Sequence, residues 1–317
     1  MKVIDKKAIR IVQAIIAIAL MFGVYIRYNI PYYSHKVFGV SYMTMNNSFY
    51  EVINVELEKV VESHGDALIT LDPALDTEKQ IEQIQRFIQQ RVTGIFVNPV
   101  DSQAIEPVLR EAKAAGISVF VIDTQIEEED LVDCTIISDN YNAGVQCALD
   151  MMKRREEADV ILLRHSEALS ASDRIQGFLD TIAEHPQYRI VGDAECEGQL
   201  EKAMPVMMNL LATCDHVDVV MALNDPSALG AMAALEKCGV KDAVVYGVDG
   251  TPDFKSLIGV DPIVAGTVAQ SPISMGRLAG EKMYDRLSGK TVDKTIVVPV
   301  DLINQDNIDE WSKTGWQ

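Results

Sequence analysis

Residues 219–253 read VVMALNDPSALGAMAALEKCGVKDAVVYGVDGTPD, and their pattern indicates the fold class. Two short apolar runs, Val217–Met221 and Val244–Val248, lie on either side of a helical stretch, Ser227–Lys237. Short apolar runs bounded by turn-forming residues are typical of buried strands. A strand, a helix and a second strand in this order indicate two parallel strands connected by a helix.

The same alternation extends over most of the chain. Further strands are predicted at Val37–Met43, Ala67–Leu71, Gly94–Val97, Ile117–Ile122, Val160–Leu163 and Ile263–Val268. Further helices are predicted at Ser48–His64, Thr77–Arg91, Ser102–Ala115, Asn140–Lys153, Ser172–Ala183, Leu200–Ala212 and Pro272–Leu287. Helices that alternate with strands in this way favour an α/β fold, in which parallel sheets carry helices on both faces. These elements are too many for one small sheet, so they predict two Rossmann-like lobes.

The composition excludes several classes of function. The chain of 317 residues has 28 Lys and Arg against 47 Asp and Glu, a formal net charge of −19. Such a charge repels phosphate backbones, so we expect no nucleic-acid partner. The five cysteines are scattered and form no CxxC pair, and the chain has no HExxH motif. We therefore expect neither a disulfide framework nor a metal site, and no cofactor.

A basic cluster precedes an apolar run at the amino terminus. The run Ile11–Ile26, which is interrupted only by Gln13, measures about 24 Å as a helix and falls slightly short of a bilayer core. The basic side is expected to stay in the cytoplasm. Residues 1–36 are therefore predicted to be a hydrophobic signal anchor and spacer, which leaves the remainder extracytoplasmic. A cleaved signal peptide is the alternative, although no small-residue cleavage site follows the run directly.

Four predicted strands end in Asn or Asp. These residues are Asn98, Asp123, Asn224 with its neighbour Asp225, and Asp249. In open α/β sheets, ligands bind just beyond the carboxyl ends of the strands. Asn and Asp side chains can hydrogen-bond to several hydroxyl groups. The alternative is that they form turns or cap helices, and Asp225 in particular resembles a helix cap.

Two further groups are predicted near the same edge. Phe49 and Tyr50 follow the first strand, where an aromatic ring can pack on the C–H face of a sugar and Asn47 can reach a hydroxyl. Arg174 falls in the first turn of a predicted helix, where its rigid set of donors suits neighbouring oxygens. Ordinary core packing of the aromatic rings and a solvated arginine are the alternatives.

Five motifs occur in an order that resembles a known family. They are MNNSFY at 45–50, VNPVDS at 97–102, NDPSALGAMAAL at 224–235, GVDGTPD at 247–253 and VAQSP at 268–272. Their order is similar to that in the ribose-binding protein and its relatives, the extracytoplasmic monosaccharide-binding proteins of ABC importers. The resemblance covers nearly all of Val37 to Ile303. It implies two similar lobes joined by three crossovers, one formed by 37–138 and 271–301 and the other by 139–270 and 302–317.

The resemblance also implies a set of ligand-binding residues. Asn47, Phe49, Asn98 and Asp123 would bind from the first lobe; Tyr50 there replaces a phenylalanine of the family. Arg174, Asn224 and Asp249 would bind from the second lobe, with Gln270 at a crossover.

Two departures from the family pattern concern the same pocket. Thr124 stands where the ribose binder has an arginine, and Cys196, in AECEG, lies in a segment where the ribose binder has an aromatic residue. A bidentate donor and one stacking face are therefore missing. We expect a bulkier or differently hydroxylated sugar or polyol, and not ribose.

The predicted function is sugar binding coupled to closure of the lobes, which delivers the sugar to an ABC permease. A membrane-tethered sensor that presents the sugar to a histidine kinase is the main alternative. A sugar-responsive transcription regulator would need a DNA-binding helix pair where this chain has an apolar segment. An enzyme is not expected, because Asp123 and Asp249 suit the holding of a sugar as well as its hydrolysis and no nucleophile motif accompanies them.

Overall fold

The structure is a computed structural model that describes residues 13, 15–21 and 35–317. Residues 13 and 15–21 are helical and exposed. The rest of the predicted signal anchor lies outside the described residues. Within the described part of the chain, no helix combines the length and the apolarity that crossing a membrane requires. Residues 37–317 form one compact unit that contains both sheets.

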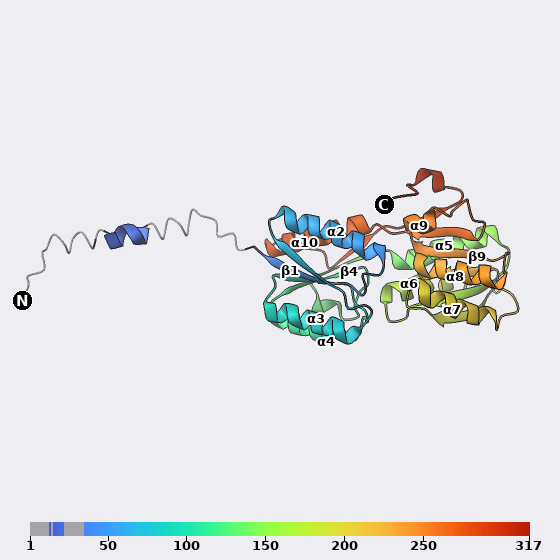
Figure 1. Cartoon of the computed structure of the whole chain (residues 1–317), viewed down its shortest axis with the longest axis horizontal. Coiled ribbons are helices and arrows are strands. Elements are labelled where there is room, and N and C mark those ends of the chain that lie inside the picture. Colours follow the sequence, from blue (N-terminus) through green and yellow to red (C-terminus); the bar gives the residue numbers. More distant parts are fainter. Residues whose placement is uncertain (1–12, 14, 22–34) are drawn as a thin grey trace, which may run out of the picture. The chain divides into compact units, whose positions relative to one another are not determined.

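The first lobe is built on a six-stranded parallel sheet in the order β11-β5-β4-β3-β1-β2. Its strands are β1 (Val37–Ser41), β2 (Ala67–Leu71), β3 (Gly94–Val97), β4 (Ser118–Ile122), β5 (Cys134–Ser138) and β11 (Thr295–Val298). Its helices are α2 (Ser48–Ser63), α3 (Thr77–Gln90), α4 (Glu106–Ala114) and α10 (Pro272–Leu287). Helices α2 and α10 pack together on one face of the sheet, and α3 and α4 cover the other (Figure 1).

The second lobe repeats this plan in the order β12-β10-β9-β8-β6-β7. Its strands are β6 (Ala158–Arg164), β7 (Tyr188–Glu195), β8 (Val219–Ala222), β9 (Val244–Asp249), β10 (Val264–Ala269) and β12 (Asp301–Asn304). Its helices are α5 (Asn140–Arg154), α6 (Leu169–Ile182), α7 (Leu200–Leu211), α8 (Asp225–Cys238) and α9 (Pro252–Lys255). The edge strand β12 runs antiparallel to β10, and the remaining pairs are parallel.

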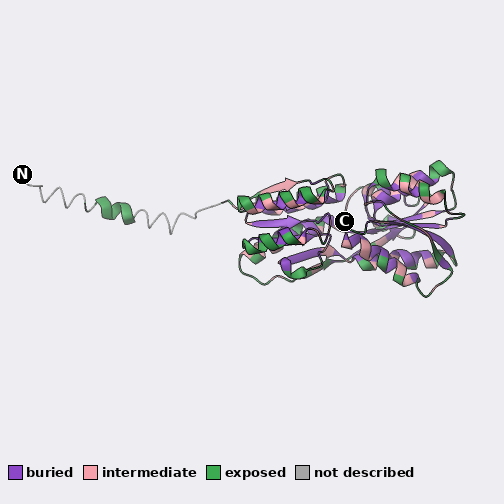
Figure 2. Cartoon of the chain, turned by 90° about the horizontal axis from the view of Figure 1, so that it is seen from below, coloured by how far each residue is buried: buried purple, intermediate pink, exposed green. Residues whose placement is uncertain are grey.

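Both faces of each sheet are buried, which explains the continuous apolar runs in the sequence. In β6, Val160 and Leu162 pack with α5 and α6, whereas Ile161 and Leu163 belong to the hydrophobic cluster that includes α7 and α8. Successive side chains of a strand point to opposite faces, so a strand covered on both sides is apolar at every position. Figure 2 shows most strands buried and the outward sides of the helices exposed, whereas β2, β7 and β11 carry exposed or half-buried residues.

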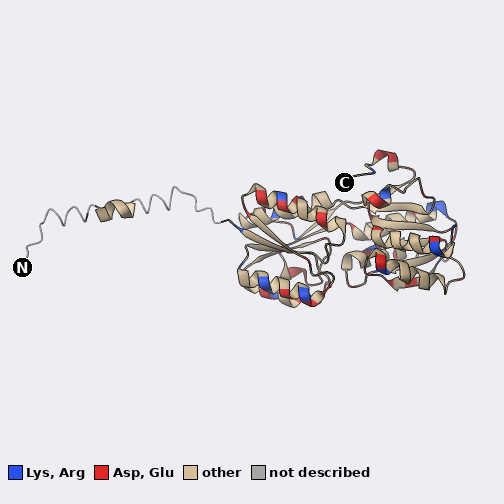
Figure 3. Ribbon diagram, viewed as in Figure 1, with Lys and Arg blue, Asp and Glu red and all other residues tan. Residues whose placement is uncertain are grey.

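The chain passes between the two sheets three times, after β5, after β10 and between β11 and β12. This confirms the expected α/β fold with two lobes. In the view of Figure 3, Lys and Arg lie scattered among Asp and Glu on the helices.

Some boundaries differ from those predicted. The helix predicted from Ser102 begins at Glu106, because the Asp101 carboxylate accepts the backbone N–H groups of Gln103 and Ala104 and holds a turn there. Four strands were not predicted. β7, β11 and β12 carry exposed residues and none of them is apolar at every position, and β5 (CTIIS) contains the polar residues Thr135 and Ser138.

Candidate functional site

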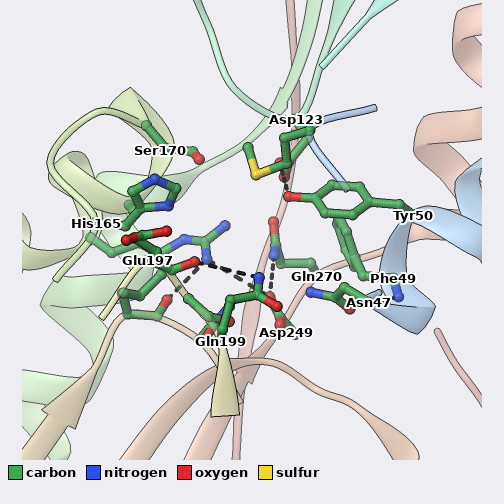
Figure 4. A pocket seen from close by; sticks show the side chains of 17 residues that line it. Asn47, Phe49, Tyr50, Asp123, His165, Ser170, Glu197, Gln199, Asp249 and Gln270 are labelled. Carbon is green, nitrogen blue, oxygen red and sulfur yellow. Dashed lines mark hydrogen bonds and ion pairs between the residues drawn. The ribbon is translucent and has the colours of Figure 1, made fainter. Parts of the chain in front are cut away.

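A polar cleft lies between the two lobes at the carboxyl ends of the parallel strands (Figure 4). The cleft is partly open to solvent. The first lobe contributes Met43, Asn47, Phe49, Tyr50 and Asp123. The second lobe contributes His165, Ala168, Ser170, Ala171, Arg174, Glu197, Gly198, Gln199, Leu223, Asn224 and Asp249, and Gln270 follows β10 at a crossover.

Most of the predicted site residues line this one cleft. Those brought together are Asn47, Phe49, Tyr50, Asp123, Arg174, Asn224, Asp249 and Gln270. Asn98, Thr124 and Cys196 do not line it, because each is buried behind the lining and bonded to other side chains. Within the described chain, no cluster of three or more His, Cys, Asp or Glu residues could hold a metal ion.

Asp123 is placed by a network inside the first lobe. It follows β4 with a positive φ of 72°, which turns its carboxylate out of the strand direction. The Tyr50 hydroxyl donates to its Oδ2 at 3.3 Å, and the Asn98 amide donates to the same oxygen at 3.2 Å. Asn98 is held in turn by the backbone N–H of Met43, which donates to its Oδ1 at 3.0 Å. Asn98 is therefore a positioning residue for Asp123.

The other carboxylate oxygen of Asp123 has no hydrogen-bond partner. Its Oδ1 is buried and unpaired in the described structure, and the residue is 3% exposed. Burial raises the pKa of the carboxyl, while Arg174 and three hydrogen bonds act in the opposite direction. A buried acceptor without a donor costs free energy. Asp123 is thus prepared to accept a hydrogen bond from a molecule that enters the cleft.

Arg174 is held where α6 crosses α5. A Cβ atom on Gly144 of α5 would lie 1.8 Å from the carbonyl oxygen of Arg174, so only glycine permits this approach. The guanidinium donates from Nε to Asn140 Oδ1 at 2.8 Å and from Nη1 to the carbonyl of Leu223 at 3.0 Å. It is buried, and its Nη1 lies 3.7 Å from Oδ1 of Asp249.

Asp249 ends β9 beside the crossover. Gln270 donates from Nε2 to its Oδ1 at 2.7 Å, and Oε1 of Gln270 is buried without a partner. Burial raises the pKa of Asp249 well above its usual value, although Arg174 lowers it.

The neighbouring carboxyl of Asp225 accepts from the backbone N–H of Thr251 and the hydroxyl of Thr267, both at 2.7 Å. Burial raises the pKa of Asp225 to about 7.

Asn224 and Asn47 each cap a helix and also line the cleft, so the two alternatives considered for such residues are compatible at these two positions. Asn224 is the cap of α8, since its Oδ1 accepts from Ser227 N while its Nδ2 donates to Gly198 O. Asn47 caps α2 through its Oδ1, which accepts from Phe49 N at 2.9 Å. Both residues still line the cleft. Asp225 is the first residue of the helix, and it is not the cap.

Thr124 and Cys196 occupy buried positions beside the cleft. The Thr124 hydroxyl shares a hydrogen bond with the hydroxyl of Ser170, which belongs to the other lobe. The Cys196 thiol donates to Ser227 Oγ at 3.3 Å, and burial raises its pKa. Neither residue replaces the donor or the ring that the family pattern would supply.

Sequence reasoning missed several lining residues. His165 directly follows β6, so the strand-end rule applied to that strand would have found it; burial lowers the pKa of its imidazole. Glu197 and Gln199 lie in the loop after β7, a strand that the sequence did not reveal. Glu197 pairs with Lys202 and has a positive φ of 52°.

Comparison with known proteins agrees with this architecture. A sequence profile described as "Periplasmic binding protein domain" matches residues 38–291. The ribose import binding protein of Bacillus subtilis (strain 168) is 35% identical over 84% of this chain and 87% of that protein. The ribose import binding protein of Escherichia coli (strain K12) is 32% identical over 82% and 86%. The binding protein of the arabinose ABC transporter from Shewanella sp. ANA-3 superposes with a TM-score of 0.80 at 28% identity, covering 87% of this chain and 94% of that one.

Two α/β lobes with a polar cleft between them define a class of proteins that enclose a small ligand by hinge closure. This chain belongs to the periplasmic binding protein family, as an extracytoplasmic member related to the ribose import binding proteins. The resemblance inferred from the motifs is confirmed. The expectation of a binding protein, rather than an enzyme, is confirmed with it.

Proposed function

We propose that this protein binds a monosaccharide or a related polyol in the cleft between its lobes and delivers it to an ABC importer permease. The observation that carries the proposal is the pair of buried oxygens without donors, Oδ1 of Asp123 and Oε1 of Gln270. Both residues line the cleft with Arg174 and Asp249. A hydroxyl group can both donate and accept a hydrogen bond. A ligand rich in hydroxyl groups can therefore donate to these two unpaired oxygens and accept from the guanidinium of Arg174.

The names of relatives support a small carbohydrate. The two relatives above are named ribose import binding proteins, and a structure of an ABC transporter solute-binding protein from Mycobacterium smegmatis, 26% identical, has bound glycerol. The resemblance implies that Thr124 stands where the ribose binder has an arginine and that Cys196 lies in a segment where it has an aromatic residue. We therefore propose that the preferred ligand is a bulkier or differently hydroxylated sugar or polyol, and not ribose.

Closure is the mechanism that we propose for capture. Contacts that cross the cleft include the Thr124–Ser170 hydrogen bond, and Gln125 donating to Asp173 at 2.6 Å. The backbone N–H of Ser102 also donates to the carbonyl of Glu167 at 3.2 Å. These contacts belong to a closed form. A ligand that contacts both lobes binds the closed form more tightly than the open form. It shifts the population toward the closed form by an amount set by this difference in affinity.

A thermal-shift screen of sugars and polyols tests the proposal. A ligand that binds only the folded protein raises its melting temperature, and the rise grows with the logarithm of the ligand concentration relative to Kd. The panel contains D-ribose, L-arabinose, D-galactose, D-allose and myo-inositol, with Asp249→Ala as the matched control. We expect a rise with at least one compound, larger than that with D-ribose, and a clearly smaller rise with the same compound in the variant. If no compound stabilises the wild type, sugar binding is contradicted; if D-ribose binds most tightly, the ligand preference is wrong.

The apolar run near the amino terminus favours a second proposal about attachment. We propose that residues 1–36 tether the protein to the outside of the membrane, because basic residues precede the run and bulky ones follow it. Tethering also keeps open the alternative of a sensor that presents the sugar to a histidine kinase. Cross-linking in the presence of the stabilising sugar separates the two: capture of a permease supports import, and capture of a kinase supports sensing. Recovery of the chain in the soluble extracytoplasmic fraction, beginning after Ile26, would contradict the tether.

A further inference from the structure

Residues 311–317 cross from the second lobe toward the first. They follow β12 and the short turn of helix Ile308–Glu310, which belong to the second lobe. The C-terminal end of the chain lies between the two lobes in both views (Figures 1 and 2). We call residues 311–317 the strap.

The strap is anchored on the second lobe by a buried lysine. Lys255 of α9 is fully buried, and its ammonium group donates to Gly315 O at 2.7 Å and to Gln317 Oε1 at 2.6 Å. No salt bridge to Lys255 is found among residues 35–317. A buried ammonium group is costly unless its protons are bonded. Both of its hydrogen-bond partners here are strap atoms, so Lys255 and the strap depend on each other.

The strap then reaches the ligand site from two sides. The Gln317 amide donates to the carbonyl of Gln270 at 2.9 Å and to that of Asp249 at 3.3 Å. The Trp316 ring lies 5.7 Å from the Phe49 ring, centroid to centroid, at an angle of 59°. Phe49 lines the cleft from the first lobe, whereas Gln270 and Asp249 line it from the crossover and the second lobe.

We propose that the strap stabilises the closed form and positions the Phe49 ring against the ligand, with Trp316 as the positioning residue and Lys255 as the anchor. The proposal rests on the proposed function only in treating this cleft as the ligand site. Trp316 is fixed to the second lobe through its neighbours Gly315 and Gln317, and it contacts the first lobe. Opening the cleft therefore breaks this contact or pulls the strap from Lys255.

Hydrogen exchange in the ligand-free protein tests the effect on closure. The amide of Ser102 is hydrogen-bonded across the lobes to Glu167, so its exchange rate reports the open fraction. An aromatic contact of this kind changes a two-state population by about two- to tenfold. We expect Trp316→Ala to accelerate deuterium uptake in a peptide that contains Ser102 by that factor. The matched control is Trp311→Ala: this tryptophan also packs on the hydrophobic core, but it precedes the segment of the strap that Lys255 holds and that contacts Phe49.

The outcomes separate the proposal from general destabilisation. A peptide that contains β8 should exchange alike in both variants and in the wild type. Unchanged uptake at Ser102 in Trp316→Ala overturns the proposal, as does an equal acceleration in Trp311→Ala. Because no sugar is added, a failure of the sugar screen leaves this result unaffected.

Fluorescence tests the anchor independently. The chain has two tryptophans, so Trp311→Phe leaves Trp316 as the single reporter. In that background, Lys255→Met should raise the acrylamide quenching of Trp316, because the released strap exposes its indole to solvent. Lys237→Met, on the surface of α8, is the control. Equal quenching with and without Lys255→Met shows that the lysine does not hold the strap.

Discussion

The first lobe lines the cleft mainly with Phe49, Tyr50 and Met43, whereas the second lines it with charged and amide groups such as Arg174 and Asp249. The two lobes nevertheless share one sheet plan. The second lobe therefore supplies most of the polar contacts, while the first supplies apolar surface, the amide of Asn47 and one carboxylate, Asp123. Substitutions in either lobe test this division of roles.

The largest expected effect is on the helix pair that places Arg174 in the second lobe. Gly144→Ala puts a methyl group into the backbone of α6, and this overlap can be relieved only by moving the helix. We expect a loss of about 3 kcal/mol or more in the free energy of unfolding, measured by urea denaturation. At Gly192 the added atom would meet only side chains, the nearest at 3.1 Å. Equal losses in Gly144→Ala and Gly192→Ala would show that the helix crossing is not tight.

The next effect is on the charge that the second lobe contributes. Arg174→Met removes the guanidinium that hydrogen-bonds within the lobe and lies beside Asp249. We expect the affinity for the tightest sugar of the panel to fall by about ten- to hundredfold in calorimetry. Arg164→Met is the control, because Arg164 pairs with Asp193 and does not line the cleft. If only Arg164→Met lowers the affinity for the sugar, the assignment of Arg174 to the ligand site is wrong.

The aromatic contribution of the first lobe is smaller. Phe49→Ala removes the ring that lines the cleft and contacts Trp316. We expect about three- to tenfold weaker sugar binding, with a faster dissociation rate in stopped-flow fluorescence. Phe49→Leu keeps an apolar side chain without a flat face, so its affinity should fall by less. An unchanged dissociation rate in Phe49→Ala would remove the ring from the site.

The pH dependence of stability tests a buried carboxyl of the second lobe, Asp225. The pKa of Asp225 is raised to about 7 by burial, so between its unfolded value near 3.8 and that value the folded state binds the proton that the unfolded state releases. The free energy of unfolding therefore falls as the pH rises through this window. Asp225→Asn should reduce the decrease in the free energy of unfolding between about pH 5 and about pH 8. Asp285→Asn, at a half-buried carboxyl whose pKa Lys290 lowers, should leave the pH dependence of the free energy of unfolding unchanged. Parallel curves for wild type and Asp225→Asn would contradict the buried-acid interpretation.

Much of the fold could be predicted because buried parallel strands leave an unmistakable pattern. β3, β8 and β9 are apolar at nearly every position, and their polar ends marked Asn98, Asn224 and Asp249. The half-exposed β7 gave no such pattern, and so the loop that carries Glu197 and Gln199 was missed.

Finer placement depended on packing that the sequence does not encode locally. Whether Asn98 faces the cleft or supports Asp123 is decided by hydrogen bonds across three strands. The strap could not be predicted either. Its contacts join Lys255 to residues 60 or more positions away, and no periodic pattern marks such a pairing.

The central claim is that buried polar groups of both lobes hydrogen-bond to one hydroxylated ligand. Calorimetric titration of wild type and Asp249→Ala with the panel of sugars and polyols tests it most directly. We predict one-to-one binding of at least one compound to the wild type and at least about tenfold weaker binding to the variant, with the fold intact by circular dichroism. Equal affinity in the two proteins, or no heat with any compound, would contradict it.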